Sequence, residues 1–176
     1  MPNLFDLSTT LTVIFAALLV GNVATQLWLN ARQARHVWTH RDTVPMAFAA
    51  SVSLAEHQKA ADYTLAKLRL GNWGILLSAT VLLGWTLMGG LEALNLALRD
   101  VFGAGMTQQL ALMASVTALG SLIELPLSWW RTFRLEAAFG FNKTTPKLWI
   151  NDLLKGALLG ALLGLPLAGV ALWLMG

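Results

Sequence analysis

Four long stretches without a charged side chain constrain this chain more than any other feature. They run from Leu7 to Ala31, from Leu70 to Leu91, from Val101 to Ile123 and from Gly156 to Gly176. Each is longer than the roughly 20 apolar residues with which a helix crosses the bilayer hydrocarbon. Only helices and closed barrels satisfy backbone hydrogen bonds in lipid, and these stretches lack the alternation of barrel strands. The sequence therefore predicts an all-α integral membrane bundle of four transmembrane helices.

The composition supports this class and excludes others. Hydrophobic residues make up 56% of the chain and charged residues only 12%, against about 25% charged in soluble domains. The net charge of +3 is only a small excess of Lys and Arg over Asp and Glu. We attribute this excess to membrane topology and therefore expect no nucleic-acid partner. The absence of cysteine excludes disulfides and thiolate zinc sites.

We expect one domain over residues 1–176, with no internal boundary. The predicted spans are about 8–29, 71–92, 105–130 and 156–175, and the predicted basic loops are about 30–70 and 131–155. The first span is longer than the apolar core of a signal peptide, and no Lys or Arg precedes it. We therefore expect it to remain in the mature protein.

The basic residues predict the orientation, because cytoplasmic loops retain an excess of Lys and Arg. The first connection holds Arg32, Arg35, Arg41, Lys59, Lys67 and Arg69, the second Arg99 alone, and the third Arg131, Arg134, Lys143, Lys147 and Lys155. The N-terminal tail holds none. We expect both basic loops in the cytoplasm, with both termini and a short Asn95–Gly105 turn outside. The compact loops and the high Ala and Leu content favour a bacterial cytoplasmic (inner) membrane, and an organelle membrane is the alternative.

The first basic loop has a pattern of its own. Ser53 followed by Glu56 is typical of a capping box at a helix start. Leu54, Ala61, Leu65 and Leu68 then share one face, which predicts an additional amphipathic cytoplasmic helix. It is either an extension of the second transmembrane helix or an interfacial helix broken at Gly71.

The histidines do not favour a metal site. His36 and His40 have the spacing of the zinc motif H-E-x-x-H, but Val37 stands where the motif has glutamate, and no further ligand follows at suitable spacing. We interpret them as interfacial side chains. We expect no catalytic residue, metal ligand or cofactor in this chain.

Two features inside the spans have more than one interpretation. Glu124, two residues before Pro126, faces either the bundle interior, as in a transporter's ion site, or interfacial water. Gly156, Gly160 and Gly164 recur every four residues and form a close-packing stripe. Internal packing is the favoured interpretation of the stripe, and homodimerisation is the alternative.

The third connection predicts a structured turn. Gly140 permits backbone conformations that other residues resist, and Asn142 can bond nearby backbone groups. Thr144 or Thr145 before Pro146 is typical of a helix start. The favoured interpretation is a tight cytoplasmic turn with no direct chemistry. In the alternative, the carboxylates of Glu136 and Asp152 pair with Lys143, Lys147 or arginines of the first loop.

The stretch Glu124–Lys155, ELPLSWWRTFRLEAAFGFNKTTPKLWINDLLK, resembles the N-terminal membrane region of integral-membrane zinc metallopeptidases typified by the type I CAAX prenyl endopeptidase. The first loop agrees in its Arg41–Pro45 turn. The resemblance covers nearly the whole chain. The matching residues, taken as candidates for the family motif or chamber, are Glu124, Pro126, Glu136, Phe139, Gly140, Phe141, Asn142, Thr144, Asp152, Lys155, Glu56, Tyr63 and Lys67.

The resemblance implies that this chain is the N-terminal membrane part of a zinc metalloendopeptidase. Family members carry H-E-x-x-H in a portion that follows this membrane region, and that motif does not occur here. We therefore expect this chain to be inactive alone, as a truncated or natural short form. Its expected partners are the lipid bilayer, a zinc-bearing catalytic portion on the same or another chain, and the peptide substrate of the complete protease. The alternative is a non-catalytic small membrane protein acting as a scaffold or partner-binding subunit.

Overall fold

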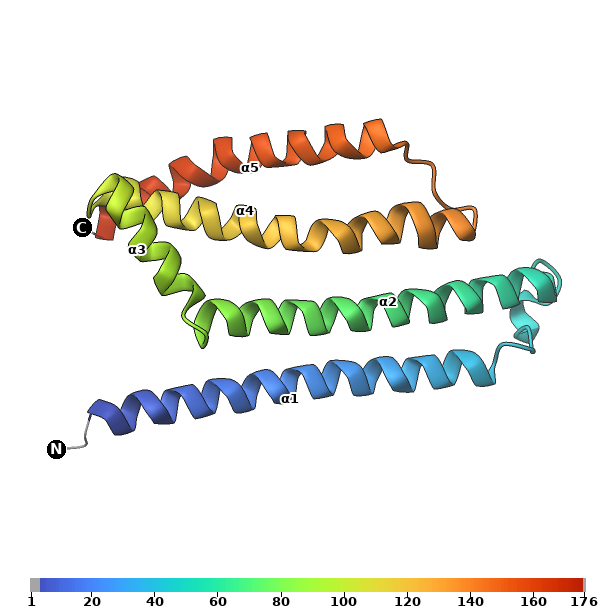
Figure 1. Cartoon of the computed structure of the whole chain (residues 1–176). Helices are drawn as coiled ribbons and strands as arrows, with labels where there is room; N and C mark the ends of the chain where they lie inside the picture. Colours follow the sequence, from blue (N-terminus) through green and yellow to red (C-terminus); the bar gives the residue numbers. More distant parts are fainter. Residues whose placement is uncertain (1–3, 176) are drawn as a thin grey trace. The chain divides into compact units, whose positions relative to one another are not determined.

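The computed structural model describes residues 4–175, with side chains from Leu7 onwards, and this part of the chain is helical with no strand. The elements are α1 (Leu4–Thr39), a short 3₁₀ helix η1 (Met46–Phe48), α2 (Leu54–Thr86), α3 (Gly90–Phe102), α4 (Met106–Trp130), a π-helical segment η2 (Arg131–Glu136) and α5 (Pro146–Met175). The predicted all-α class is confirmed (Figure 1).

The chain divides into two compact units, which are described separately. The first contains residues up to Leu83 together with Trp129–Phe141. Within it, α1 and α2 run antiparallel and side by side (Figure 1). Asn30 Nδ2 donates to Asn72 Oδ1 at 2.7 Å, and further along the pair Arg41 Nε donates to Asp62 Oδ1 at 2.8 Å. These two contacts fix the register of the hairpin.

The start of α2 has the predicted capping box. The backbone N–H of Ser53 donates to Glu56 Oε2 at 2.9 Å, and the backbone N–H of Glu56 lies 3.3 Å from Ser53 Oγ. The helix continues without a break through Gly71. Of the two alternatives, the structure shows the extension of the membrane helix and no separate interfacial helix.

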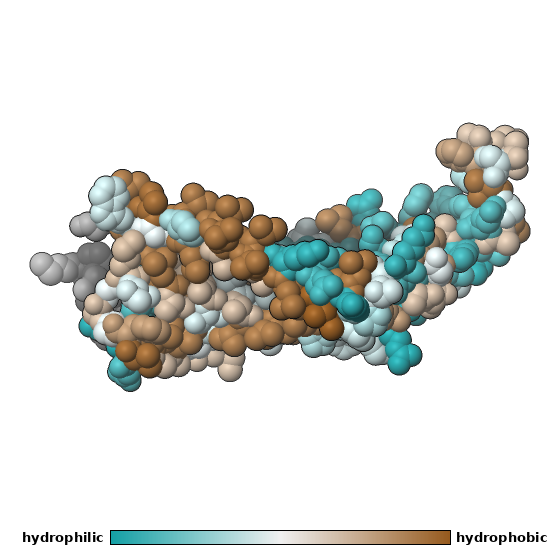
Figure 2. Space-filling view, turned by 90° about the horizontal axis from the view of Figure 1, so that it is seen from above, coloured by the Kyte–Doolittle hydropathy of each residue, from teal (hydrophilic) through white to brown (hydrophobic). Residues whose placement is uncertain are grey.

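The long helices are apolar enough to cross a membrane. In the described part, α1, the α4–η2 helix and α5 pass by length and composition, and a fourth span exists if the bent pair α2 and α3 counts as one. Their apolar windows are 0% buried inside the protein. Figure 2 shows hydrophobic residues gathered in broad exposed areas, apart from hydrophilic ones. Such large exposed apolar areas mark a surface that contacts lipid or protein rather than water.

The second predicted span needs correction at its C-terminal end. Residues 71–92 are not one helix, because α2 ends at Thr86 and α3 begins at Gly90 with a bend of 54°. Gly89 has a φ of +77°, a left-handed conformation that only glycine adopts without strain. The expected Asn95–Gly105 turn is also wrong, since α3 continues to Phe102.

Within the second unit, a polar contact joins α3 to α4. Gln108 is 7% exposed, and its Nε2 donates to Asn95 Oδ1 at 2.6 Å. A buried amide without a partner is costly, so this bond stabilises the α3–α4 hairpin. Asn95 was expected at the start of a turn, and it instead lies inside a helix.

The third connection is shorter than the predicted loop at 131–155. After Trp130 the chain continues as the π-helical segment η2, and α5 begins at Pro146. Sequence analysis placed the loop boundaries at charged residues, but charge does not end a helix outside the membrane. The helices α4 and α5 run side by side (Figure 1), and a Cβ atom added at Gly169 of α5 would lie 3.6 Å from Met106 Cε of α4.

The glycine stripe of α5 does not pack as expected. A Cβ atom added at Gly156, Gly160 or Gly164 would meet nothing within 4 Å in the described part of the chain. Internal packing of the stripe, the favoured interpretation, is therefore not observed within the second unit.

We predict that Gly90→Ala destabilises the protein. Its Cβ would lie 2.7 Å from the carbonyl oxygen of Gly84, and relieving such overpacking costs about 1–3 kcal/mol. Thermal unfolding in detergent should show a lower Tm. The control Gly120→Ala, with open space around the new Cβ, should leave the Tm unchanged or raise it. Equal effects of the two substitutions would contradict the close approach.

Candidate functional site

The first and third connections meet at an aromatic contact within the first unit. The Tyr63 ring of α2 lies 5.4 Å from the Phe139 ring and 4.9 Å from the Phe141 ring, with interplanar angles of 67° and 70°. Both pairs have the edge-to-face geometry that aromatic quadrupoles favour. The structure thus brings Tyr63 of the first connection to two neighbouring phenylalanines of the third connection, which lie far along the sequence.

Lys59 completes this group. It lies one helical turn before Tyr63, and its Nζ is 5.6 Å from the centroid of the Phe141 ring, within the range of a cation–π interaction. Sequence analysis counted Lys59 only as a basic loop residue. Its position four residues before Tyr63 was the signal that would have placed both on one face. We refer to Lys59, Tyr63, Phe139 and Phe141 as the aromatic cluster.

A tight turn at Gly140 positions Phe139 and Phe141 against Tyr63. The N–H of Gly140 donates to the carbonyl of Ala137 at 3.1 Å, and the N–H of Phe141 donates to that of Glu136 at 2.9 Å. Gly140 has a φ of +77°, so the predicted glycine conformation is confirmed. Leu135, only 8% exposed, anchors the segment that precedes the turn.

The predicted features after the turn are also present. The N–H of Thr144 donates to Asn142 Oδ1 at 2.7 Å. The N–H of Leu148 donates to Thr145 Oγ1 at 3.2 Å, so Thr145 caps α5, which begins at Pro146. Of the two threonines considered, Thr145 is the cap.

A second polar contact joins the turn after α1 to α2. Arg41 Nε and Nη2 donate to the two carboxylate oxygens of Asp62 at 2.8 and 2.9 Å. This hydrogen bonding lowers the pKa of the Asp62 carboxyl and raises the pKa of Arg41. Asp62 was not singled out from the sequence, because nothing local links residues 21 positions apart.

Several sequence candidates have exposed positions or only local contacts. Glu124, Asp152 and Lys155 are exposed on α4 and α5, and Lys67 is exposed on α2. Glu56 serves the helix cap, where the backbone N–H of Ser53 lowers the pKa of its carboxyl. Within its own unit, each of these residues has a local contact or an exposed position.

The ion pairs considered as the alternative for the third connection are not observed in the described residues. In residues 7–175, neither Glu136 nor Asp152 forms an ion pair, and the recorded pairs all involve Arg41. Glu136 contributes its backbone carbonyl to the turn instead. A backbone role of this kind leaves no trace in the side-chain pattern.

The histidines lie close together without forming a metal centre. The rings of His36 and His40 are 4.2 Å apart, and His57 Nε2 lies 3.0 Å from the carbonyl oxygen of His40. Among the residues that the structure describes, no group of three or more His, Asp or Glu side chains could hold a metal ion.

Comparisons with known proteins identify the relatives of this chain. A family model described as CAAX prenyl protease N-terminal, five membrane helices, matches residues 33–176. A probable CAAX prenyl protease 1 of Schizosaccharomyces pombe is 29% identical over 175 residues, which cover 90% of this chain and 36% of the relative. CAAX prenyl protease 1 of Saccharomyces cerevisiae is 40% identical over 62 residues, 35% of this chain and 14% of the relative.

The fold comparison agrees. The crystal structure of S. mikatae Ste24p matches with a TM-score of 0.79 and 24% identity, over 88% of this chain and 37% of that chain. The chain therefore spans about a third of the proteins that it matches along most of its length. The family description gives five membrane helices, and our count of four spans stays a prediction. These yeast relatives give no support to a bacterial membrane.

We predict that Gly140→Ala destabilises the turn through backbone strain alone. The nearest atom to an added Cβ is Lys59 Nζ at 3.9 Å, so no steric clash arises. A non-glycine residue held at a positive φ costs about 1–3 kcal/mol, and the Tm should fall. Gly140→Asn is the matched control, because asparagine tolerates this conformation better, and it should recover part of the loss. An alanine variant as stable as wild type would contradict the prediction.

We also predict an acid-labile contribution from Arg41 and Asp62. The folded-state pKa of Asp62 is lowered, so the pair stabilises the hairpin above the unfolded pKa of about 3.9. This contribution is lost as the pH falls through the lower folded pKa. The side chains are 26% and 41% exposed, so salt should weaken the effect.

Thermal unfolding between about pH 2 and pH 7 tests this pair, because the loss of stability falls at and below the unfolded pKa of Asp62. Wild type should lose more stability in acid than Asp62→Asn. The control Asp100→Asn, which changes an exposed carboxylate of α3, should retain the wild-type pH profile. Parallel profiles for wild type and Asp62→Asn would show that the pair contributes nothing.

Proposed function

We propose, from the premise that the chain belongs to the CAAX prenyl protease N-terminal family, that it forms part of the membrane chamber of a zinc metalloendopeptidase. In this proposal residues 1–176 act as one domain with four spans. The basic loops face the cytoplasm, and both termini lie on the other side. The chain supplies the chamber wall and not the reacting groups.

The aromatic cluster is the observation that carries this proposal. Tyr63 of α2 contacts both Phe139 and Phe141, so it ties together the two connections that contain the family motif residues. A chamber wall must hold its loops in place while a peptide passes. Rigid side chains at such a contact preserve the geometry at a distant reaction centre.

The remaining motif residues have supporting roles in this proposal. Gly140, Asn142 and Thr144 shape the turn through their backbone contacts, and Glu136 accepts the N–H of Phe141 through its carbonyl. The exposed residues Glu124, Pro126, Asp152, Lys155 and Lys67 are placed to face lipid, substrate or the catalytic portion.

Zinc belongs to the catalytic portion in this proposal. The described residues offer no group of three or more ligands, so we assign no metal-binding role to this chain. When bound in the catalytic portion, zinc polarises the scissile carbonyl and activates water. This chain's contribution is to orient the peptide and limit its access to water.

A chimera tests the proposal. The part of the Schizosaccharomyces pombe relative that lies beyond the matched region is fused after Gly176, and cleavage of a peptide with a prenylated C-a-a-X terminus is measured. We expect cleavage that a zinc chelator abolishes. Tyr63→Ala should lower kcat/KM by roughly tenfold, since misplaced supporting elements cost that much or more.

Two controls make the result decisive. Met46→Ala changes a side chain that is 97% exposed in η1, and it should leave kcat/KM unchanged. Each chimera is checked for helicity and bound zinc before the assay. A folded, zinc-loaded chimera that does not cleave the peptide would reject the proposed function.

A further inference from the structure

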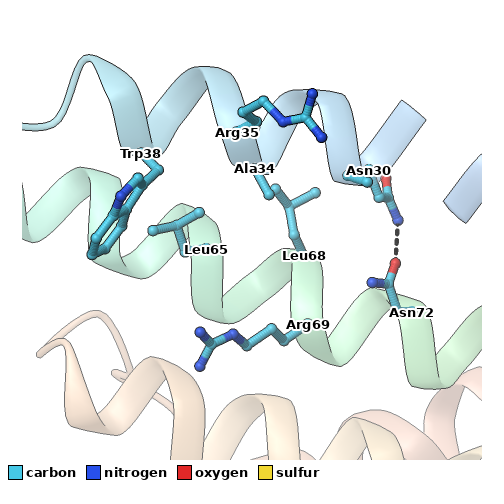
Figure 3. A pocket seen from close by; sticks show the side chains of 9 residues that line it. Asn30, Ala34, Arg35, Trp38, Leu65, Leu68, Arg69 and Asn72 are labelled. Atoms are coloured by element: carbon cyan, nitrogen blue, oxygen red, sulfur yellow. Dashed lines mark hydrogen bonds between the residues drawn. The ribbon is translucent and has the colours of Figure 1, made fainter. Parts of the chain in front are cut away.

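A cavity opens between α1 and α2 within the first unit. It has a volume of about 300 Å³ and is lined by residues of both helices (Figure 3). Those that carry the argument are Asn30, Ala31, Arg35, Leu68, Arg69 and Asn72. None of them belongs to the aromatic cluster, so the cavity is a separate feature from the proposed chamber contact.

An amide pair closes one end of the cavity. Figure 3 shows the bond from Asn30 to Asn72, in which Asn30 Nδ2 donates to Asn72 Oδ1 at 2.7 Å. The Nδ2 group of Asn72 has no recorded partner among residues 7–175, and no buried polar side-chain atom there lacks one. This amide is therefore open to the cavity or solvent and can donate to a ligand.

Two arginines supply positive charge. Arg35 comes from α1 and Arg69 from α2, and both are exposed residues that line the cavity. Figure 3 shows Arg35 lying along α1 and Arg69 extending from the side of α2 away from α1, so the two guanidinium groups point apart and each must turn to reach one anion. In the described part of the chain, neither guanidinium group is paired with a carboxylate. Exposed side chains change rotamer within nanoseconds, so both can turn toward a bound anion.

The cavity lies at the expected height of the membrane surface. On α1, the charge-free stretch ends at Ala31, and on α2 the next one begins at Leu70, directly after Arg69. Trp28 and Trp73, whose rings are typical of the membrane interface, are 57% and 68% exposed near these ends. Phosphate groups of lipids lie at this height.

The chemistry of the lining selects the class of ligand. Arginine forms bidentate bonds with phosphate oxygens, and an amide N–H adds a further donor. Basic pockets between membrane helices bind anionic head groups. A volume of about 300 Å³ is at the small end of ligand sites, so it suits a phosphate and a few attached atoms. Leu68 adds an apolar contact beside them.

We propose that the α1–α2 cavity binds a phosphate group with uncompensated negative charge, held by Arg35, Arg69 and Asn72. The source is either the head group of an anionic phospholipid or free inorganic phosphate. This site is independent of the proposed protease function, because it involves neither the aromatic cluster nor a catalytic portion.

Native mass spectrometry of the complete purified protein in detergent tests the site. Phosphatidylglycerol, phosphatidylcholine and inorganic phosphate are titrated separately, and phosphate is then added in competition with phosphatidylglycerol. We expect wild type to prefer phosphatidylglycerol over phosphatidylcholine. The double variant Arg35→Gln, Arg69→Gln should bind phosphatidylglycerol roughly tenfold more weakly or worse, because it loses the charge-assisted hydrogen bonds. Saturable binding of inorganic phosphate that this variant loses would assign the site to free phosphate.

Two further variants separate the cavity from general surface charge. Lys143→Gln, Lys147→Gln removes two exposed charges before and at the start of α5 and should retain binding. Ala31→Phe keeps both arginines but fills the cavity, and it should weaken binding. Tm measurements verify that each variant is folded.

Three results would overturn the proposal. Wild type could show no preference for phosphatidylglycerol and no saturable binding of phosphate. The arginine and lysine variants could lose binding equally, which indicates diffuse charge. Finally, folded Ala31→Phe could bind as wild type does, which would place the anion outside the cavity.

Discussion

The need to satisfy every backbone hydrogen bond within lipid is the constraint on which the rest of the structure depends. It makes each charge-free stretch a helix, and it leaves the positions of charged residues to decide where each helix meets water. The helices do not stop there. The helix α1 has 36 residues, about 54 Å at 1.5 Å per residue, against about 30 Å of hydrocarbon. The surplus length is available for contacts outside the membrane.

Those helical extensions create the contacts of functional interest. Because α2 begins at Leu54 and continues unbroken into its apolar part, Tyr63 occupies a rigid helix rather than a loop. The π-helical segment η2 likewise continues directly from α4, so the turn at Gly140 is presented by a helix end. Two phenylalanines then reach one tyrosine. Loop residues become precisely placed because the elements carrying them are extensions of membrane helices.

The sequence was sufficient to predict features governed by local chemistry. The capping box at Ser53, the left-handed Gly140 and the cap before Pro146 depend on neighbours within a few residues, and all three are confirmed. The bend at Gly89 was missed because an apolar run conceals a break when no charge marks it. The contacts of Tyr63 and of Asp62 were also missed. They join distant segments, and their partners depend on helix register, which hydropathy does not specify.

The amide pair of Asn30 and Asn72 explains how that register is set. Each helix carries this polar group at the edge of a charge-free stretch, where an unpaired amide is expensive. A slip of one turn would move the helices about 5.4 Å past each other and separate the two amides. The same slip would break the contact of Arg41 with Asp62. Two polar contacts at different heights therefore exclude alternative registers, which apolar packing alone would tolerate.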